Sequence, residues 1–321
     1  MSYPVRRSLG SAATLTLWVF AGCVGGGYKP PPIEAGALAS EESERAVSLI
    51  SDRIALSGRM RNIEFALITA AAPFCANIAV PNLGVILATE QTFTGDVART
   101  AAREKVGLGE GVTILHVVPS SGTALAGVKA GDTVLSAGGR AVKAPEDVFE
   151  SLKENRTRVK LRLKRGSEEI EHVVEPDLAC PVTLEYSNSA QLLPASTSRV
   201  TAGVPRGLVR FFERDDDLAV VIAHQIAHLL FARPGSEIDS ERRFDVIGLF
   251  LAARAGYDVS NAVEVWEKIV GEYPWLATPR PDPAYRNYPH GGVALRVEGI
   301  RRAIAEIRAL QDRGADIVPP S

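Results

Sequence analysis

The chain has 321 residues, enough for about two domains with substantial hydrophobic cores. Its 36 basic and 38 acidic side chains nearly balance, and no basic stripe stands out along the chain. This composition argues against a nucleic acid as the partner and leaves local motifs to indicate the function.

The first residues have the organisation of an export signal. Arg6 and Arg7 precede an apolar stretch, residues 11–21, which is too short to span a bilayer. This stretch leads into Phe-Ala-Gly-Cys at residues 20–23, which resembles the cleavage site of bacterial lipoproteins. The resemblance implies that residues 1–23 are a lipoprotein signal peptide and that Cys23 becomes the lipidated first residue of the mature protein. An ordinary secretory signal with an incidental cysteine is the alternative.

The residue after Cys23 bears on the destination of the protein. Val24 stands there instead of aspartate, so retention in the inner membrane is not indicated. The resemblance therefore implies a lipid anchor in the bacterial cell envelope, in the outer membrane and facing the periplasm. Residues 24–36, which are rich in glycine and proline, are expected to form a flexible tether.

Residues 41–72 carry apolar side chains at helical spacing, which predicts one long helix or two, ending near Pro73. Two further cysteines, Cys75 and Cys180, flank the middle of the chain. An even pair in an exported protein predicts a disulfide, which would clamp the two ends of the middle segment together. Two buried thiols are the alternative.

From residue 83 to about residue 175 the pattern changes to short alternating strands separated by glycine turns. We expect strands at residues 111–118, 133–136, 159–163 and 170–174, and a short helix at residues 144–153. Gly127 and Gly131 fit tight turns in which a Cβ atom would be strained. The run from Gly111 to Gly139, with its small-residue turn and its Ala-Gly-Val-Lys-Ala-Gly-Asp sequence, is similar to the PDZ domains of bacterial envelope proteases.

This resemblance implies a β-rich PDZ domain at residues 81–176. Such a domain has a groove that takes the C-terminus of a protein or peptide by adding it as a strand. Leu83, Gly84 and Val85 form the candidate loop whose backbone N–H groups would hold the terminal carboxylate. A PDZ fold that serves only as a rigid spacer is the alternative.

The last part of the chain predicts a strand at residues 182–186 and helices at 216–231, 240–255, 261–270 and 293–310. Asp215 is the expected N-cap of the first helix, and Gly256 fits the end of the second. Within the first helix, His224 and His228 are four residues apart. They therefore lie on one helical face and can bind one zinc ion together.

Four local patterns in this region resemble, in order, the metallopeptidases that include HtpX, BepA and the CAAX prenyl endopeptidases. They are residues 218–228, the E-x-x-x-D-x-x-G pattern from Glu241 to Gly248, Ala-Gly-Tyr-Asp at residues 255–258, and His290 six residues before Arg296. The resemblance implies a mainly helical, gluzincin-type domain with a small sheet at residues 177–315, completed by a helical part at residues 37–80. The chain would then be α+β, with the PDZ domain inserted into the metallopeptidase-like domain.

The same resemblance implies the roles of the site residues. His224, His228 and Glu241 would bind one zinc ion, with water as its fourth ligand. Asp245 would contact a ligand histidine and orient it without binding the metal itself, and His290 would stabilise the oxyanion of the tetrahedral intermediate. Residues 188–195 loosely match the strand that lines the substrate cleft of the family, without its glycines.

Gln225 is the residue that sets this chain apart from the family. At this position the family has glutamate, the general base that deprotonates the zinc-bound water. A glutamine amide is neutral and cannot accept that proton. We therefore expect an envelope pseudopeptidase that binds zinc and protein substrates or partners but cuts very slowly. The alternative, favoured by the intact ligand set, is an active zinc metalloendopeptidase in envelope protein quality control.

Overall fold

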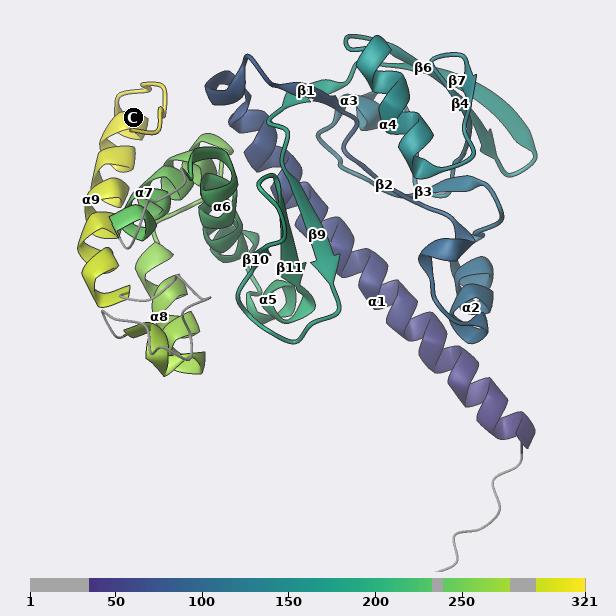
Figure 1. The fold of residues 1–321 in the computed structure, drawn as a ribbon, viewed down its shortest axis with the longest axis horizontal. Coiled ribbons are helices and arrows are strands. Elements are labelled where there is room, and N and C mark those ends of the chain that lie inside the picture. The colour runs from purple at the N-terminus through teal and green to yellow at the C-terminus, as the bar shows by residue number, and fades with distance from the viewer. Residues whose placement is uncertain (1–34, 233–238, 278–292, 321) are drawn as a thin grey trace, which may run out of the picture. The chain divides into compact units, whose positions relative to one another are not determined.

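The computed structural model describes residues 35–232, 239–277 and 293–320 (Figure 1). Over these residues the chain is α+β, as expected. Its internal contacts divide it into residues 1–40 and residues 41–321, and the elements that carry the candidate sites belong to the second unit. Cys23 and most of the expected tether lie outside the described residues. Within the described ranges, no helix has both the length and the apolar character that crossing a membrane requires.

The N-terminal part is one long helix, α1 (Ala35–Ala70), followed by the 3-10 turn η1 (Ala72–Cys75). The sequence left open whether there is one helix or two, and the structure has one. It includes the last two residues of the expected tether, Ala35 and Gly36. Several apolar residues in the second half of α1 are buried in one cluster with the C-terminal helices: Met60, Ile63, Leu67 and Ile68.

The C-terminal part is mainly helical. The elements are α5 (Arg206–Phe211), α6 (Asp215–Phe231), α7 (Asp239–Arg254), α8 (Ala262–Glu272), η3 (Pro274–Ala277) and α9 (Val293–Asp312). Here α6 packs against α7 and α8, and α9 packs against α7 and α8 in turn. The predictions for α6 to α9 are confirmed within two residues at each end. Residues 217–227 of α6 are all buried, so this helix forms the centre of the hydrophobic cluster.

The prediction that Asp215 caps α6 was wrong. Arg214 occupies the N-cap position, and Asp215 is the first residue of the helix. The carboxylate of Asp215 instead accepts a hydrogen bond of 2.6 Å from Nε of Arg59 on α1. Nη1 of Arg59 also donates to the carbonyl oxygens of Val209 and Phe212. One arginine of α1 therefore satisfies carbonyl groups that the end of α5 leaves without helical partners, and it joins α1 to α5 and α6.

Residues 85–174 form a six-stranded antiparallel sheet, which we call the middle sheet. Its strands pair in the order β2 (Val85–Ala88), β3 (Val112–Val117), β4 (Thr133–Ala137), β6 (Val159–Arg165) and β7 (Glu168–Val174), with β5 (Arg140–Ala141) on β4. Its helices are η2 (Glu90–Thr92), α2 (Asp96–Val106), α3 (Gly122–Leu125) and α4 (Pro145–Glu154). The four predicted strands and the helix at α4 are confirmed within two residues. Gly127 and Gly131 have φ angles of +87° and +91°, as their turns require.

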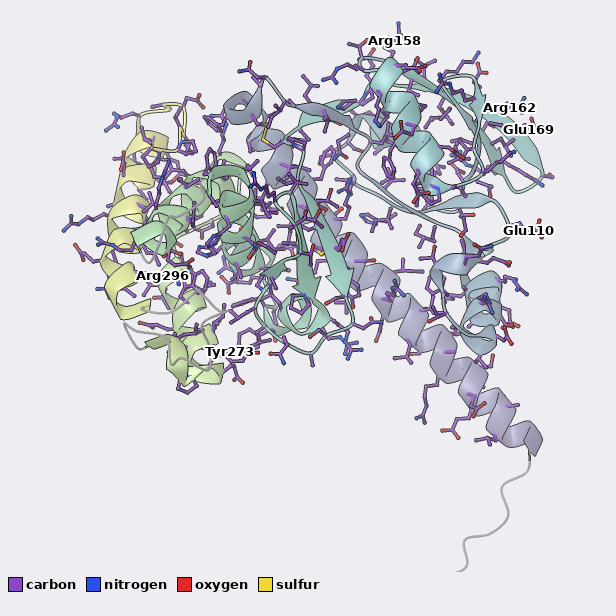
Figure 2. The ribbon with its side chains drawn as sticks, viewed as in Figure 1. Glu110, Arg158, Arg162, Glu169, Tyr273 and Arg296 are labelled. Carbon is purple, nitrogen blue, oxygen red and sulfur yellow. A yellow bond between two sulfur atoms is a disulfide. The ribbon has the colours of Figure 1, made fainter. Side chains whose placement is uncertain are left out.

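The hairpin of β6 and β7 shows the alternation that a half-buried sheet requires. Val159, Leu161 and Leu163 are buried, whereas the charged residues between them face solvent. Arg162 lies 3.9 Å from Glu169 on the neighbouring strand, and both side chains are exposed (Figure 2). Such exposed pairs contribute little to stability, so the hydrophobic face holds this hairpin in place.

Two smaller sheets complete the fold. β1 (Val80–Asn82) pairs antiparallel with β8 (Asp177–Ala179), and these two strands bring together the segments that lead into and out of the middle sheet. The other sheet has the order β10-β11-β9, formed by β10 (Ala195–Ser196), β11 (Thr201–Pro205) and β9 (Thr183–Ser187). β9 confirms the strand predicted at residues 182–186.

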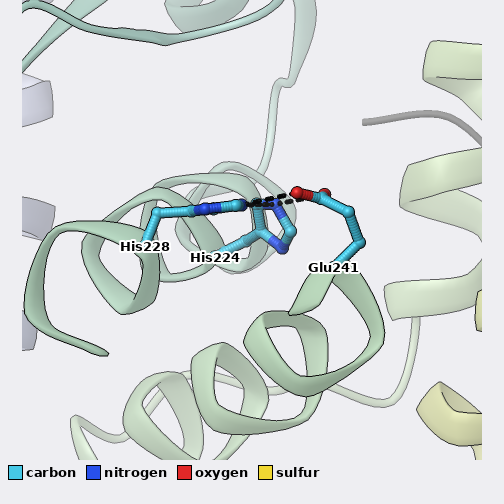
Figure 3. A group of neighbouring side chains, drawn as sticks. All are labelled: His224, His228 and Glu241. Atoms are coloured by element: carbon cyan, nitrogen blue, oxygen red, sulfur yellow. Dashed lines mark hydrogen bonds and ion pairs between the residues drawn. The ribbon is translucent and has the colours of Figure 1, made fainter. Parts of the chain in front are cut away.

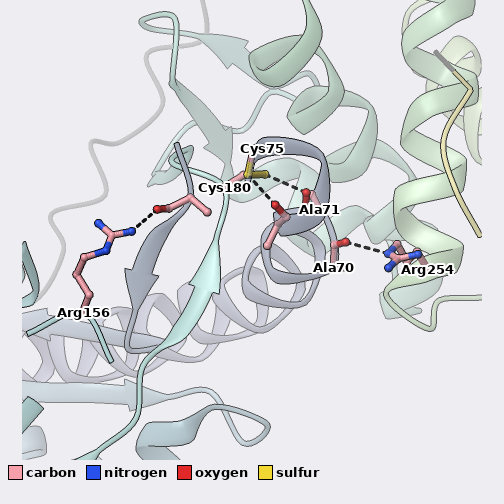
Figure 4. Close-up of a disulfide and its surroundings, with 8 residues drawn as sticks. Ala70, Ala71, Cys75, Arg156, Cys180 and Arg254 are labelled. Carbon is pink, nitrogen blue, oxygen red and sulfur yellow. Dashed lines mark hydrogen bonds between the residues drawn. A yellow bond between two sulfur atoms is a disulfide. The ribbon is translucent and has the colours of Figure 1, made fainter. Parts of the chain in front are cut away.

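The predicted disulfide between Cys75 and Cys180 is confirmed (Figure 4). The two Cα atoms are 5.7 Å apart, and the cysteines are separated by 105 residues in the chain. The backbone N–H of Cys180 also donates a hydrogen bond of 3.0 Å to the carbonyl oxygen of Ile68 in α1. The bridge therefore fastens the end of α1 to the segment that follows the middle sheet.

Replacing both bridge cysteines by serine (Cys75→Ser with Cys180→Ser) is expected to lower the free energy of unfolding by about 2–5 kcal/mol. The reason is that the bridge closes a loop of 105 residues and so restricts the unfolded chain. Urea denaturation measures the change. The reduced wild-type protein is the control and should match the double variant. Equal stability of oxidised wild type and double variant would contradict the prediction.

Candidate metal centre

The candidate metal centre lies where α6 and α7 touch. α6 contributes His224 and His228, one helical turn apart, and α7 contributes Glu241 and Asp245, also one turn apart. The two helices approach closely because α7 has Gly248 at the contact. A Cβ atom on Gly248 would lie only 2.8 Å from the backbone nitrogen of His224. Any larger residue there would push apart the two helices that carry the ligands.

Three donor atoms converge at this contact (Figure 3). The Nε2 atoms of His224 and His228 are 3.1 Å apart. Oε2 of Glu241 lies 3.4 Å from Nε2 of His224, and Oε1 of Glu241 lies 3.0 Å from Nε2 of His228. Ligands of a tetrahedral metal ion, bound at about 2.0–2.1 Å, lie about 3.3 Å from one another. The spacing of the three donors therefore fits a small divalent cation, and the structure brings the predicted ligands together as a group that could hold a metal ion.

The second nitrogen of His224 fixes the orientation of that ring. Nδ1 of His224 lies 2.9 Å from Oδ1 of Asp245. With the Nδ1 proton directed at Asp245, Nε2 of His224 is left as the acceptor that can face a metal ion. Asp245 therefore lies beside the ring of His224, and its role in orienting that ring toward a metal ion stays a prediction.

Arg296 on α9 holds this carboxylate in turn. Its Nε and Nη2 donate to the two oxygens of Asp245 at 2.6 and 2.5 Å, and Nη1 lies 3.6 Å from a carboxylate oxygen of Glu241. Its guanidinium also stacks at 4.4 Å from the ring centre of Trp266. Only 2% of Arg296 is exposed. Sequence reasoning used Arg296 as part of a motif but missed this role as the buried cation between two carboxylates.

The pKa values reflect this network. Burial alone would lower the pKa of His224, but hydrogen bonding to Asp245 and Glu241 outweighs burial and raises it. Burial alone would raise the pKa of Asp245, but the charge and hydrogen bonds of Arg296 and the bond to His224 lower it. Asp245 therefore stays ionised inside the protein, as a residue that orients an imidazole must.

Gln225 is buried beside these ligands on α6, with 2% of its surface exposed. Its Nε2 donates a hydrogen bond of 2.9 Å to Oγ of Ser196 on β10. β10 is an edge strand of its sheet among the described strands, so the amide is bonded to a sheet edge. The loosely matching segment at residues 188–195 leads into this strand, which begins only at Ala195. Ser196 carries no local signal and was missed by sequence reasoning.

The other predicted site residues do not join this group. His290 lies outside the described residues. Leu83, Gly84 and Val85 are buried where the chain enters β2, and only Val85 belongs to that strand. The structure thus brings together His224, His228, Glu241 and Asp245 in one place.

Comparison with known proteins gives one short similarity and no matching family model. A stretch of 66 residues is 36% identical to serine protease HTRA1 from Xenopus tropicalis. It covers 21% of this chain and 14% of HTRA1, so the chain spans about a seventh of that relative. A similarity of this length shows a shared segment and does not assign the chain to a family.

Proposed function

We propose that this chain is a metallopeptidase-like protein of the bacterial envelope that binds zinc and protein termini and has lost most of its proteolytic activity. The observation that carries the proposal is the set of three converging donors beside a neutral amide. His224, His228 and Glu241 have the spacing of metal ligands, while Gln225 stands where a general base would be. Such a site can bind a metal ion but lacks the general base that would deprotonate a metal-bound water.

Zinc is the ion that this donor set favours. Two imidazole nitrogens and one carboxylate oxygen are a common three-ligand set for catalytic zinc, which leaves one position open. A bound zinc ion lowers the pKa of its water ligand toward about 7. Gln225 can hydrogen-bond to such a water but cannot take its proton. We therefore expect binding without efficient cleavage.

The middle sheet is the proposed peptide-binding part, with the fold of a PDZ domain at residues 81–176. Three observations support it: the predicted strands are present, Gly127 and Gly131 take the positive φ angles of tight turns, and β2 is an edge strand to which a peptide can add. The anchoring of the chain to the outer membrane through lipidated Cys23 rests on the sequence of residues 6–23.

The second candidate function is that of an active zinc metalloendopeptidase. It is favoured by the intact arrangement around His224, in which Asp245 orients the ring and Arg296 holds Asp245. These contacts of Asp245 and Arg296 would serve no purpose in a chain that does not use a metal ion for catalysis.

Metal analysis of the purified chain tests the proposal. Elemental analysis should find about one zinc ion per chain in the wild type, and His228→Ala should lose it because a ligand is gone. His116→Ala is the matched control, since His116 lies on β3 and contacts Asn62 at 2.7 Å, outside the metal centre. Equal metal in the wild type and His228→Ala would contradict the prediction. Robust chelator-sensitive cleavage by the wild type would favour the active peptidase instead.

A further inference from the structure

A cavity of about 670 Å³ lies between α1, β2, α4 and β9. Its walls are largely apolar, with Val85 and Leu87 from β2, Phe149 and Leu152 from α4, and Leu184 from β9. Its volume is in the range of sites that bury a ligand. The cavity therefore has room for a bound segment of chain, and its walls come from both sides of the β1–β8 pair.

One wall of the cavity is a strand edge. All four residues of β2 line it, and among the described strands β2 pairs only with β3. The other edge of β2 therefore presents backbone N–H and C=O groups that an extended peptide can pair with. An occupant of this cavity is thus expected to lie as an added strand along β2.

Two hydrogen-bond donors converge at the beginning of this strand. The backbone N–H of Gly84 and Nη2 of Arg61 on α1 both donate to Oδ1 of Asn82, each at 2.9 Å. A carboxylate oxygen is a stronger acceptor than this amide oxygen and would be bound by the same two donors. The close approach depends on Gly84, whose φ is +65° and whose Cβ atom would lie 2.8 Å from Cβ of Ser121.

Arg61 has a further donor available. Its Nη1 donates to Glu64 at 2.8 Å, and the other carboxylate oxygen of Glu64 accepts the backbone N–H of Leu184 on β9 at 2.8 Å. Nε of Arg61 is buried and finds no hydrogen-bond acceptor within the described part of the chain. Both carboxylate oxygens of Glu64 therefore have hydrogen-bond partners, whereas Arg61 can donate to one more acceptor.

The charges around the cavity favour an anionic occupant. Its charged lining residues are four cations and two anions: Arg53, Arg61, Lys153, Arg156, Glu64 and Glu185. A peptide that ends in a free carboxylate complements this excess of positive charge.

We propose that Arg61 of α1 completes the site for the terminal carboxylate of a peptide bound along β2. This inference rests on the peptide-binding function proposed above and names the group outside the middle sheet that the function needs. The ligand is an extended peptide whose apolar last side chain packs among Val85, Leu87 and Leu152. Its terminal carboxylate replaces Oδ1 of Asn82 between Gly84 and Arg61. Asn82 is then an internal competitor that keeps the two donors paired until a peptide arrives.

Fluorescence anisotropy on the full chain tests this inference. The probe is a fluorescein-labelled peptide pool with degenerate positions and a C-terminal valine, made with a free and with an amidated C-terminus. The double variant Arg61→Met with Glu64→Gln is used, because glutamine keeps an acceptor for Leu184 without leaving an unpaired buried charge. The double variant should bind the free-acid pool about tenfold or more weakly than the wild type does, as expected for the loss of a hydrogen bond to a charged group. Its affinity for the amidated pool should equal that of the wild type. Asn82→Ala should bind the free-acid pool more tightly than the wild type.

Arg53→Met is the matched control. Arg53 lines the same cavity from the same helix but stacks on the ring of Phe93 at 5.3 Å, so its removal should leave the preference for the free acid intact. If the double variant fails to fold, Arg61→Lys replaces it, because lysine keeps the charge but loses the planar fork; its affinity should fall in the same direction. An Arg61 variant that prefers the free-acid pool as strongly as the wild type does would overturn the inference about Arg61 but not the proposed peptide-binding function. A wild type that binds neither pool would overturn the peptide-binding function together with it.

Discussion

Gln225→Glu is expected to raise the rate of peptide cleavage by about 10²–10⁴, the usual contribution of a general base. The variant places a carboxylate one residue after His224, on the helix that already presents both histidines. The hydroxyl of Ser196, which now accepts a hydrogen bond from the Gln225 amide, can donate to the new carboxylate, so the contact with β10 is kept. Cleavage of a fluorescently labelled unfolded protein measures the change.

Two controls separate this effect from others. Gln311→Glu makes the same chemical change at an exposed residue near the end of α9 and should leave cleavage at the wild-type level. Activity gained by Gln225→Glu should disappear when a chelator removes the metal. A Gln225→Glu variant that contains zinc but cuts no faster than the wild type would contradict the prediction.

Arg296→Met is expected to lower the free energy of unfolding of the metal-free protein by about 3–5 kcal/mol. The variant removes the cation that two buried carboxylates share, Asp245 at 2.6 Å and Glu241 at 3.6 Å. Methionine fills much of the volume beside Trp266 but neutralises neither charge. Urea denaturation in the presence of a chelator measures the loss. Added zinc should recover part of it, because the ion brings positive charge to Glu241.

Arg302→Met provides the control on the same helix. The side chain of Arg302 is 80% exposed and pairs with Glu298 at 2.9 Å. Removing an exposed pair of this kind changes stability by at most about 1 kcal/mol. Equal effects of the two variants would mean that burial does not strengthen the contacts of Arg296, contrary to the arrangement at the metal centre.

The sequence predicted the elements whose periodicity is strong. α6 to α9 and four of the six strands of the middle sheet, β3, β4, β6 and β7, were placed within two residues, because large apolar residues recur in them at regular intervals. α2 was missed because the residues it buries are mainly the small Ala101 and Ala102, which give a weak periodic signal. α5 and β10 were missed because six and two residues are too few to show any period.

The candidate site was predictable where its residues are neighbours along a helix. The spacings of His224 with His228 and of Glu241 with Asp245 encode one face of a helix directly. The roles of Arg296 and Arg61 could not be predicted in this way. They depend on how α9 packs against α7, and on how α1 packs against the start of the middle sheet. Contacts of that kind come from tertiary structure and leave no local pattern in the chain.

The ladder between β1 and β8 has a consequence for the order in which the molecule folds. Val80 and Ala179 pair in this ladder. The hydrophobic cluster that contains α6 includes residues from the chain before Val80 and from the chain after Ala179. Bringing such distant segments together as flexible chain carries an entropic cost that grows with the length of the intervening loop. Hairpins of the middle sheet need contacts only between near neighbours and can form early. Once the hairpins have formed, the intervening chain is compact. We therefore expect α1 to contact the C-terminal helices as fast as if a much shorter loop joined them.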